Sequence, residues 1–369
     1  MRFLHISDLH IGKKIGAFSM EEEQRFILDF ILDTAEKENI KFILISGDVY
    51  DKSVPPAEAV NIFDDFLTKA SKAGKIIFVI SGNHDSPDRL NFGSRLIKKN
   101  NIYISAKFSG QLDKYTVDGV NFYLLPFIKP SYVKKYYPDE PLDNTESAVK
   151  FVIDNTEIDE NEINILLAHQ FVAGESGEII LCDSEESISV GGTDRVNASV
   201  FEKFDYTALG HIHSMQTAGR DNVVYCGSPL KYSASEAVRG KFLCIADVDK
   251  EHMEITKIPI VPMHDMRVIE GRLSDIMKTA GSDDFVHITL TDKDELINPQ
   301  GMLRNIFPNM MSLKFSNTYQ DINDTISEHR SMSPAELFAK FYNLKTNDEM
   351  SEEELKIIEE ILDDISDEI

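Results

Sequence analysis

Aspartate, histidine and asparagine side chains that could bind metal ions gather in five short segments of this 369-residue chain. The segments contain Asp8 and His10; Asp48 and Asp51; Asn83, His84 and Asp85; His169; and His211 and His213. These side chains offer oxygen and nitrogen donors without a thiolate, a set that suits hard or borderline divalent ions. Because pairs of such ions are typical of hydrolytic centres, the residue types predict a two-metal hydrolytic site.

Each of these segments directly follows an apolar run that is typical of a β-strand. The runs cover residues 2–7, 41–46, 75–81, 163–168 and 206–209. Side chains just past the carboxyl ends of neighbouring strands in an open α/β sheet meet in one crevice. Helical patterns at residues 20–39 and 56–73 separate the first three runs, as βαβ units require. We therefore expect the donors to converge.

The donors divide into one bridge and two shells. A carboxylate must bridge the two ions, and Asp48 is the best candidate. The remaining donors are Asp8, His10 and one of His211 and His213 for the first ion, and Asn83, His169 and the other of these two histidines for the second. On a strand, residues two apart would point the same way, which is suitable ligand geometry for His211 and His213.

A catalytic role is predicted for His84, which lies beside the candidate ligand Asn83 but need not bind metal. From that position it could stabilise charge on the phosphate and protonate the leaving oxygen. A carboxylate from Asp85 or Asp51 could orient His84, or a ligand, through a hydrogen bond.

Taken singly, these motifs have ordinary structural explanations. A lone histidine near a strand end is more often a structural hydrogen-bonding residue, and Gly47-Asp48 could be a simple turn. Five of the ten histidines, however, lie in these segments beside a glycine, a carboxylate or another histidine. Those outside them are expected to be structural: His5, His252, His264, His287 and His329. It is the combination that favours a metal site.

The pattern of the rest of the chain predicts an α/β fold with additional parts. Short strands in the second half, added to the βαβ first half, suggest a two-sheet β-sandwich flanked by helices over residues 1–264. Strand and helix patterns restart at 265–330, which predicts a small second α/β domain that ends in a polar linker. Capping boxes at Ser333 with Glu336 and Ser351 with Glu354 predict two helices in residues 331–369. An apolar stripe on the second helix could pack on its own domain or dock into a partner's groove.

Composition bounds the possible partners and location without choosing among them. The net charge of −25 resides mostly in residues 139–162 (nine acids, one lysine) and 346–369 (eleven acids, one lysine), which leaves −7 elsewhere. Bulk charge thus neither excludes nor supports a polyanionic substrate. No apolar run is long enough for a membrane helix, and the short first run is no signal peptide. Three scattered cysteines fit a reducing cytoplasm, where we expect this protein.

The motifs together resemble those of the calcineurin-like metallophosphoesterases. The matching stretches are Asp8-Leu-His10, Gly47-Asp48-Val-Tyr-Asp51, Gly82-Asn83-His84-Asp85, Ala168-His169 and Gly210-His211-Ile-His213. This resemblance implies a two-sheet sandwich flanked by helices. It also implies that His213 joins Asp8 and His10 at one ion, while His211 joins Asn83 and His169 at the other.

More specific stretches are similar to the SbcD family of nuclease subunits: residues 82–95, 191–196, 208–213, 225–232 and 333–342. That similarity implies a metal-dependent 3'-to-5' double-strand exonuclease and single-strand or hairpin endonuclease, with two Mn²⁺ (or Mg²⁺) ions. It implies a role in DNA repair, recombination and replication. It implies that the domain at residues 265–330 is a capping domain for DNA recognition. It further implies a homodimer bound through its C-terminal helices to SbcC, an ABC-type ATPase with coiled coils.

Surface charge near the site allows two interpretations. Arg89, Arg95, Lys98 and Lys99 could contact DNA phosphates, or they could simply form a solvated helix face. The acidic segment 139–162 is expected to face away from DNA.

Two other functions compete with a nuclease. One is a small-molecule phosphomonoesterase or cyclic-nucleotide phosphodiesterase with the same metal centre, although a small substrate needs neither an extra domain nor a docking helix. The other is a metal-bound scaffold without turnover, against which the intact His84 and the full donor set speak.

Overall fold

The computed structural model describes residues 1–174, 179–182, 194–294, 296–316, 338–339, 342–343, 350–351 and 354–358. Several predicted features lie outside the described residues: half of the 191–196 motif, the linker at 317–330, the capping box of Ser333 with Glu336, and most of the final helix. The chain forms two compact units. The first contains Met1–Val268, Gly281–His287 and Phe307–Met311; the second contains Ile269–Ala280, Ile288–Ile306 and Ser312–Ile369.

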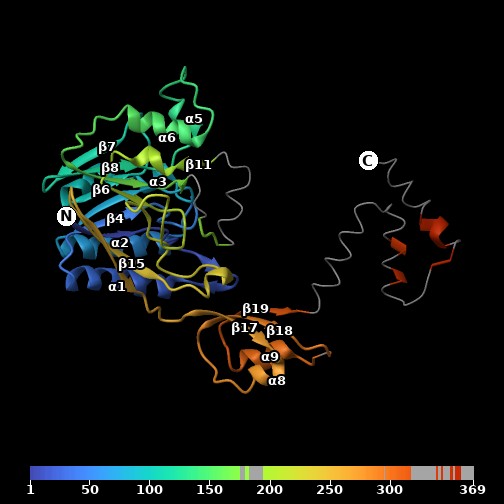
Figure 1. Ribbon diagram of the computed structural model, residues 1–369. Helices are drawn as coiled ribbons and strands as arrows, with labels where there is room; N and C mark the ends of the chain where they lie inside the picture. Colours follow the sequence, from blue (N-terminus) through green and yellow to red (C-terminus); the bar gives the residue numbers. More distant parts are fainter. Residues whose placement is uncertain are drawn as a thin grey trace. The chain divides into compact units, whose positions relative to one another are not determined.

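The first unit is built on two six-stranded sheets (Figure 1). The first sheet has the order β16-β15-β1-β4-β5-β6. Its strands are β1 (Arg2–Ile6), β4 (Phe42–Ser46), β5 (Ile76–Ile80), β6 (Ile102–Ser105), β15 (Phe242–Val248) and β16 (Met253–Pro259). Strands β1, β4, β5 and β6 run parallel, while β15 pairs antiparallel with β1 and with β16.

The second sheet has the order β13-β14-β12-β9-β8-β7. Its strands are β7 (Asp113–Val117), β8 (Val120–Leu125), β9 (Ile163–Ala168), β12 (Tyr206–Leu209), β13 (Gln216–Thr217) and β14 (Val223–Tyr225). The four central strands β8, β9, β12 and β14 are parallel, and β7 and β13 add antiparallel edges. Two short pairs accompany the sheets: β2 (Lys14–Ile15) with β3 (Phe18–Ser19), and β10 (Phe171–Ala173) with β11 (Arg195–Asn197).

Apolar side chains of the two sheets pack against each other and form the centre of the sandwich. Phe78 of β5 stacks on Phe122 of β8 with ring centroids 4.2 Å apart, and Phe42 of β4 lies 5.6 Å from the same ring. Strands that are buried on both faces have continuous apolar sequences. This burial explains the unbroken apolar runs of β4 and β5. The predicted two-sheet sandwich is confirmed.

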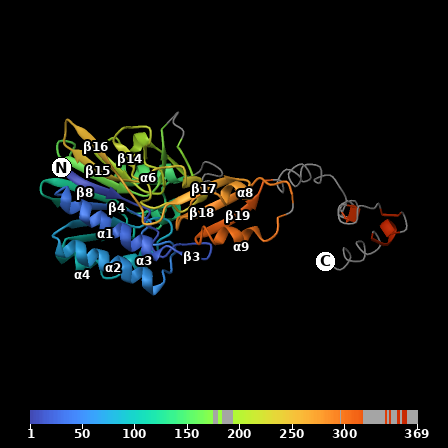
Figure 2. The ribbon, with the colours of Figure 1, turned by 90° about the horizontal axis from the view of Figure 1, so that it is seen from below.

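Helices cover the outer faces of both sheets (Figures 1 and 2). Helices α1 (Glu21–Lys37) and α2 (Ala57–Lys72) bury Ile27, Ile31 and Phe66 against the first sheet. Helix α6 (Thr145–Asp154) buries Val149 and Val152 against the second sheet. The remaining helical segments are short: α3 (Pro87–Leu90), α4 (Ser94–Ile97), α5 (Pro130–Val133), and the 3-10 turns η1 (Lys98–Asn100), η2 (Ala198–Phe201) and η3 (Ala234–Glu236).

The strand–helix pattern predicted after residue 265 is present as a β-α-β-α-β run. A three-stranded sheet of order β17-β18-β19 is formed by β17 (Met266–Gly271), β18 (Phe285–Leu290) and β19 (Met310–Phe315). Helices α8 (Leu273–Ile276) and α9 (Pro299–Arg304) connect the strands. The boundaries of a separate capping domain stay a prediction.

Near the C-terminus, the capping box of Ser351 with Glu354 is confirmed. Glu354 accepts hydrogen bonds from the Ser351 backbone N–H (2.9 Å) and hydroxyl (2.7 Å), and its own N–H donates to that hydroxyl (3.4 Å). Within the described residues, no helix is long and apolar enough to cross a membrane.

Candidate metal centre

The candidate ligands lie in loops that leave the carboxyl ends of β1, β4, β5, β9 and β12. These strands belong to two sheets, three to the first and two to the second, and not to one open sheet as the strand pattern first suggested. Convergence is preserved because the two sheets pack face to face and their parallel strands end at the same side, where His169 Nδ1 lies 2.7 Å from the carbonyl of Ser46. The centre therefore bridges the sandwich.

Four candidate metal-binding residues have a left-handed backbone: Asp8 (φ 53°), His10 (φ 44°), Asp48 (φ 48°) and His211 (φ 96°). Such conformations are costly for residues with a side chain and persist where the surroundings fix them. Backbone hydrogen bonds supply that constraint, since the Asp8 N–H donates to Gly47 (3.1 Å) and the His10 N–H donates to Asp48 (3.0 Å). The loops are thus held in shapes that aim the side chains inward.

Three glycines of the motifs are required by close packing around these side chains. A Cβ on Gly82 would overlap the Asp48 carboxylate, and one on Gly47 would overlap the His169 ring. A Cβ on Gly210 would overlap the carbonyl oxygen of Ser46. These three glycines, which precede Asp48, Asn83 and His211, are therefore part of the site.

One donor cluster gathers Asp8, His10 and His213, whose ligand atoms lie within 4.8 Å of one another. His10 Nε2 and His213 Nε2 face each other at 3.2 Å, and His10 Nε2 lies 3.8 Å from Asp48 Oδ2. Two imidazole nitrogens that converge in this way could hold one cation between them.

A second cluster gathers Asn83, His169 and His211. Asn83 Oδ1 lies 3.1 Å from His169 Nε2 and 3.0 Å from His211 Nδ1. His169 Nε2 also lies 3.4 Å from Asp48 Oδ2, the same oxygen that approaches the first cluster. One carboxylate oxygen that serves both clusters is the arrangement a bridging ligand requires.

His213 lies with Asp8 and His10, and His211 lies with Asn83 and His169, which is the grouping that the family resemblance implies; their role as ligands stays a prediction. The separate expectation that both histidines project from a strand was wrong. Strand β12 ends at Leu209, so His211 and His213 do not project from a strand. They enter different clusters from a loop in which His211 has a positive φ. The i, i+2 spacing alone could not have shown this.

The ionisation of these residues suits divalent ions. Burial lowers the pKa of His211 to about 3 and holds that of His10 well below its usual value, so both rings are neutral donors. Burial opposes the charge on Asp48, yet the neighbouring His169 outweighs it and lowers the pKa of Asp48. Burial also opposes a charge on His169, but Asp48 and Asp8 outweigh it and raise the pKa of His169 to about 9. The buried His10 Nδ1 has no hydrogen-bond partner within the described part of the chain. Neutral His10 and His211 beside an ionised, buried Asp48 suit cations, and a bound cation would replace the proton on His169.

His84 lies beside both clusters and is oriented by backbone groups. The ring nitrogen Nδ1 of His84 lies 3.0 Å from the Asp51 carbonyl, and the backbone N–H of His84 donates to Asp48 Oδ1 at 2.9 Å. The ring is only partly buried and stands edge-on to the His10 ring, with centroids 4.9 Å apart. The Asp51 carboxylate is engaged elsewhere, at 2.6 Å from Lys13 Nζ.

Asp85, the other residue predicted for catalysis, holds the loops together. Its carboxylate accepts the backbone N–H groups of Val49 (3.1 Å), Tyr50 (2.9 Å) and Gly82 (2.9 Å). It thereby ties the loop after β4 to the loop after β5, which carries Asn83 and His84. Its contacts are with backbone, so the structure gives it a positioning role and not the orientation of the His84 ring.

Sequence reasoning missed a buried carboxylate behind His213. Glu236 is fully buried, and its Oε1 lies 3.5 Å from His213 Nδ1, a long polar contact. Its Oε2 accepts Lys241 Nζ at 2.6 Å, and Lys241 also donates to the His213 carbonyl at 2.9 Å. Acceptors behind a ligating histidine fix its ring and tautomer. No spacing signal links residues 213, 236 and 241 in the sequence.

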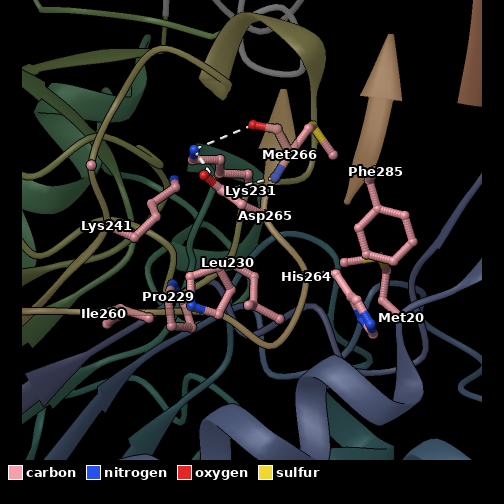
Figure 3. Close-up of a pocket in the computed structure, with 12 residues that line it drawn as sticks. Met20, Pro229, Leu230, Lys231, Lys241, Ile260, His264, Asp265, Met266 and Phe285 are labelled. Carbon is pink, nitrogen blue, oxygen red and sulfur yellow. Dashed lines mark hydrogen bonds and ion pairs between the residues drawn. The ribbon is translucent and has the colours of Figure 1, made fainter. Parts of the chain in front are cut away.

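Lys241 also borders a small cavity of about 110 Å³ within the first unit (Figure 3). Apolar side chains such as Leu230, Ile260 and Phe285 line it together with polar groups. Figure 3 shows Lys231 reaching Asp265, at 2.8 Å, and the carbonyl of Met266, at 3.4 Å. Both lysines of the cavity are thus committed to internal partners.

Together, the two-sheet fold and the paired donor clusters define a metallophosphoesterase. The sequence profile described as Calcineurin-like phosphoesterase matches residues 1–215. The chain belongs to this family and uses divalent metal ions. A second profile, described as Type 5 capsule protein repressor C-terminal domain, matches residues 262–346.

Individual relatives extend the similarity to the whole chain. The D subunit of the SbcCD nuclease of Staphylococcus epidermidis is 30% identical over 377 residues, which cover 100% of this chain and 99% of the relative. A crystal structure of a dimetal phosphatase from Danio rerio is a more distant likeness, with 12% identity and a TM-score of 0.39. The match covers 71% of this chain and 98% of the Danio rerio chain. The family assignment rests on the sequence matches.

Proposed function

We propose that this protein is the nuclease subunit of an SbcCD-type complex that acts in DNA repair, recombination and replication. Its activity would be metal-dependent hydrolysis of DNA phosphodiester bonds, as a 3'-to-5' exonuclease on double strands and an endonuclease on single strands and hairpins. Similarity over the full length to a nuclease subunit supports the substrate. The observation that carries the chemistry is the approach of one Asp48 oxygen to both donor clusters.

Seven residues would hold the two ions: Asp8, His10, Asp48, Asn83, His169, His211 and His213. When bound, a pair of ions in such a site supplies a polarised phosphate and an activated water. Mn²⁺ is the ion we favour over Mg²⁺, because four of the seven proposed donors are histidines and the harder Mg²⁺ accepts imidazole nitrogen less readily than Mn²⁺ does. Metal analysis of protein purified without added metal tests this preference.

The protein's own residues would position the substrate and move the proton. The Asp51 carbonyl can only accept, so the His84 Nδ1 that faces it carries a hydrogen, and Nε2 is the opposite ring nitrogen. In the doubly protonated ring, Nε2 would donate its proton to the leaving oxygen, which would leave the ring neutral. Asp85 keeps the His84 loop fixed against the Asp48 loop, so that the ring does not drift from the reacting phosphate.

The activity is tested with purified, manganese-loaded protein on duplex DNA and on a chromogenic phosphomonoester. We expect DNA to be degraded, and we expect His84→Gln to lower the rate by 100-fold or more, a typical share for acid–base catalysis. The variant should keep two ions per chain. Faster turnover of the monoester than of DNA would favour a small-molecule phosphatase, and unchanged cleavage by His84→Gln would remove its role.

We further propose that the protein is a homodimer. Phe92 and Leu96 are 89% and 78% exposed, and Val60 of α2 is 43% exposed. Phe92 and Val60 line a largely apolar groove of about 570 Å³ between α2 and the α3–α4 segment. Exposed apolar surface of this kind is typical of interaction sites. Light scattering should give a dimer mass, and a double change of Phe92 and Leu96 to Asp should give a monomer.

For the C-terminal helices, we propose docking on an SbcC-type ATPase with coiled coils. The apolar stripe of residues 355–365 and the name of the full-length relative support this assignment. Deleting residues 333–369 should abolish ATPase binding in a pull-down while nuclease activity on short single strands remains. Retained binding would exclude these helices as the main contact.

We infer a cytoplasmic location. The described residues contain no disulfide bond, and Cys182, Cys226 and Cys244 are buried, as suits structural cysteines in a reducing compartment.

A further inference from the structure

A hollow of about 190 Å³ opens beside the metal centre, against the second donor cluster. Two of its walls, Asn83 and His211, are donors of that cluster. The other walls are Phe127, Lys129, Thr145, Gln170, Phe171 and Asp194. A group that enters this hollow must therefore lie next to any phosphate held at the second cluster.

Two aromatic side chains flank the hollow where it meets the metal donors. Phe127 stands edge-on to the His169 ring with centroids 6.4 Å apart, and Phe171 meets the His211 ring at 6.5 Å. Both are partly exposed. The loop that carries Phe127 is fixed to the loop after β5, since the Phe127 N–H donates to Ser81 at 2.9 Å. Held aromatic rings beside a phosphate site are suited to stacking on bases of single-stranded nucleic acid.

The polar groups of the hollow suit a nucleotide as well. Lys129 is exposed, and its Nζ lies 5.8 Å from the Phe127 ring centroid, so it brings a positive charge to the aromatic rim. Thr145, at the start of α6, donates to Asp194 at 3.2 Å. It belongs to the acidic segment 139–162 that was expected to face away from DNA, and this part of the segment instead borders the hollow. Buried Gln170 donates to the Ile128 carbonyl at 3.3 Å. A cation, a carboxylate and an amide around a ring-lined hollow can meet a phosphate and the polar edge of a base.

We propose that this hollow is a base pocket, which receives the nucleobase of the nucleotide that carries the scissile phosphate. Phe127 and Phe171 contact the base, and Lys129 lies toward the phosphate that follows it. The proposal rests on the proposed function, because it assigns part of the same DNA substrate. It implies that the enzyme unstacks the nucleotide it cleaves, which favours strand ends and single strands over duplex interiors.

Competitive inhibition with a matched pair of ligands tests the base pocket. Deoxyadenosine monophosphate and 2-deoxyribose 5-phosphate share the phosphate and sugar, so the ratio of their inhibition constants isolates the base. Wild-type enzyme should bind the nucleotide more tightly. Phe171→Ala should weaken nucleotide inhibition roughly 5- to 150-fold, the range that one base–aromatic stack contributes, and leave the sugar phosphate unchanged.

The design includes controls for folding and for the proposed function. Phe26→Ala alters a partly exposed ring on α1 and should leave both constants unchanged. If Phe171→Ala fails to fold or loses metal, the inhibition constants are measured for Phe171→Leu and Phe127→Leu instead. Each of these variants should reduce the preference for the nucleotide over the sugar phosphate. Equal inhibition of wild-type enzyme by both ligands, or a ratio unmoved in every folded Phe127 and Phe171 variant, would overturn the base pocket. Failure of wild-type enzyme to cleave DNA would instead overturn the proposed function.

Discussion

Glu236 is predicted to set the affinity of one metal ion through its contact with His213. The perturbation is Glu236→Gln, which keeps the shape of the side chain and removes its charge. In the native protein the carboxylate is 0% exposed and pairs at 2.6 Å with Lys241, which is 7% exposed. Removing one partner of a buried pair costs roughly 3–5 kcal/mol of folding free energy. Losing the acceptor behind a ligating histidine lowers metal affinity about 10- to 100-fold.

A double variant separates these two effects. Glu236→Gln with Lys241→Met removes the unpaired charge as well, and the cavity of about 110 Å³ beside Lys241 leaves space for the methionine. We expect the double variant to regain most of the unfolding free energy in urea titrations. The Mn²⁺ affinity of the site that contains His213 is measured by calorimetric titration of chelator-stripped protein. In the double variant this affinity should stay as low as in Glu236→Gln, because His213 still lacks its carboxylate.

Glu23→Gln is the matched control. Glu23 is 3% exposed and lies 2.6 Å from the ring of His264, a histidine outside both donor clusters. This change should destabilise the fold without altering Mn²⁺ binding. Native affinity at both sites in the double variant would refute the positioning role of Glu236, as would an equal loss in Glu23→Gln.

Three further predictions follow from single contacts. Gly82→Ala should lower Mn²⁺ content measured by mass spectrometry, because its Cβ would overlap the Asp48 carboxylate, whereas Gly271→Ala, with its nearest contact at 3.6 Å, should bind normally. Asp85→Asn leaves one oxygen for three backbone N–H donors and should cost about 2–3 kcal/mol in urea unfolding, with a fall in kcat; wild-type stability would contradict its loop-tying role. Burial lowers the pKa of His5 to about 3, so the unfolded chain takes up a proton below pH 6.5 and the folded one does not. Stability should therefore fall by about 1.4 kcal/mol per pH unit between pH 6.5 and 3, and His5→Leu should lack that component in metal-free protein.

Much of the fold could be predicted because local patterns and the buried environment agree. The runs before the five motifs became β1, β4, β5, β9 and β12, with β9 and β12 ending at the predicted residues. Assignment of strands to sheets was beyond the sequence, since nothing local shows that β9 and β12 pair with each other and not with β5. On α1, which the helical pattern at residues 20–39 predicts, Phe26 is 40% exposed while Leu28 is buried. A small rotation of α1 about its axis determines which of these side chains faces the sheet. That rotation is set by packing in the folded protein and not by the local sequence.

The candidate site was predictable where chemistry and spacing coincide, and not where long-range contacts decide. All seven proposed ligands meet in two clusters, because each follows a strand whose end is fixed by the sandwich. The functions of Asp85, Glu236 and Lys241 depend on partners from distant loops. Nothing in the sequence around Glu236, which lies in a 3-10 turn, indicates its contact with His213.

Anomalous diffraction from Mn²⁺-soaked crystals tests the central claim most directly. We predict two peaks about 3.5–4 Å apart, with Asp48 Oδ2 between them. One should be bound by Asp8, His10 and His213, and the other by Asn83, His169 and His211. A single peak, or two peaks that do not share Asp48, would contradict the dinuclear centre on which the proposed nuclease rests.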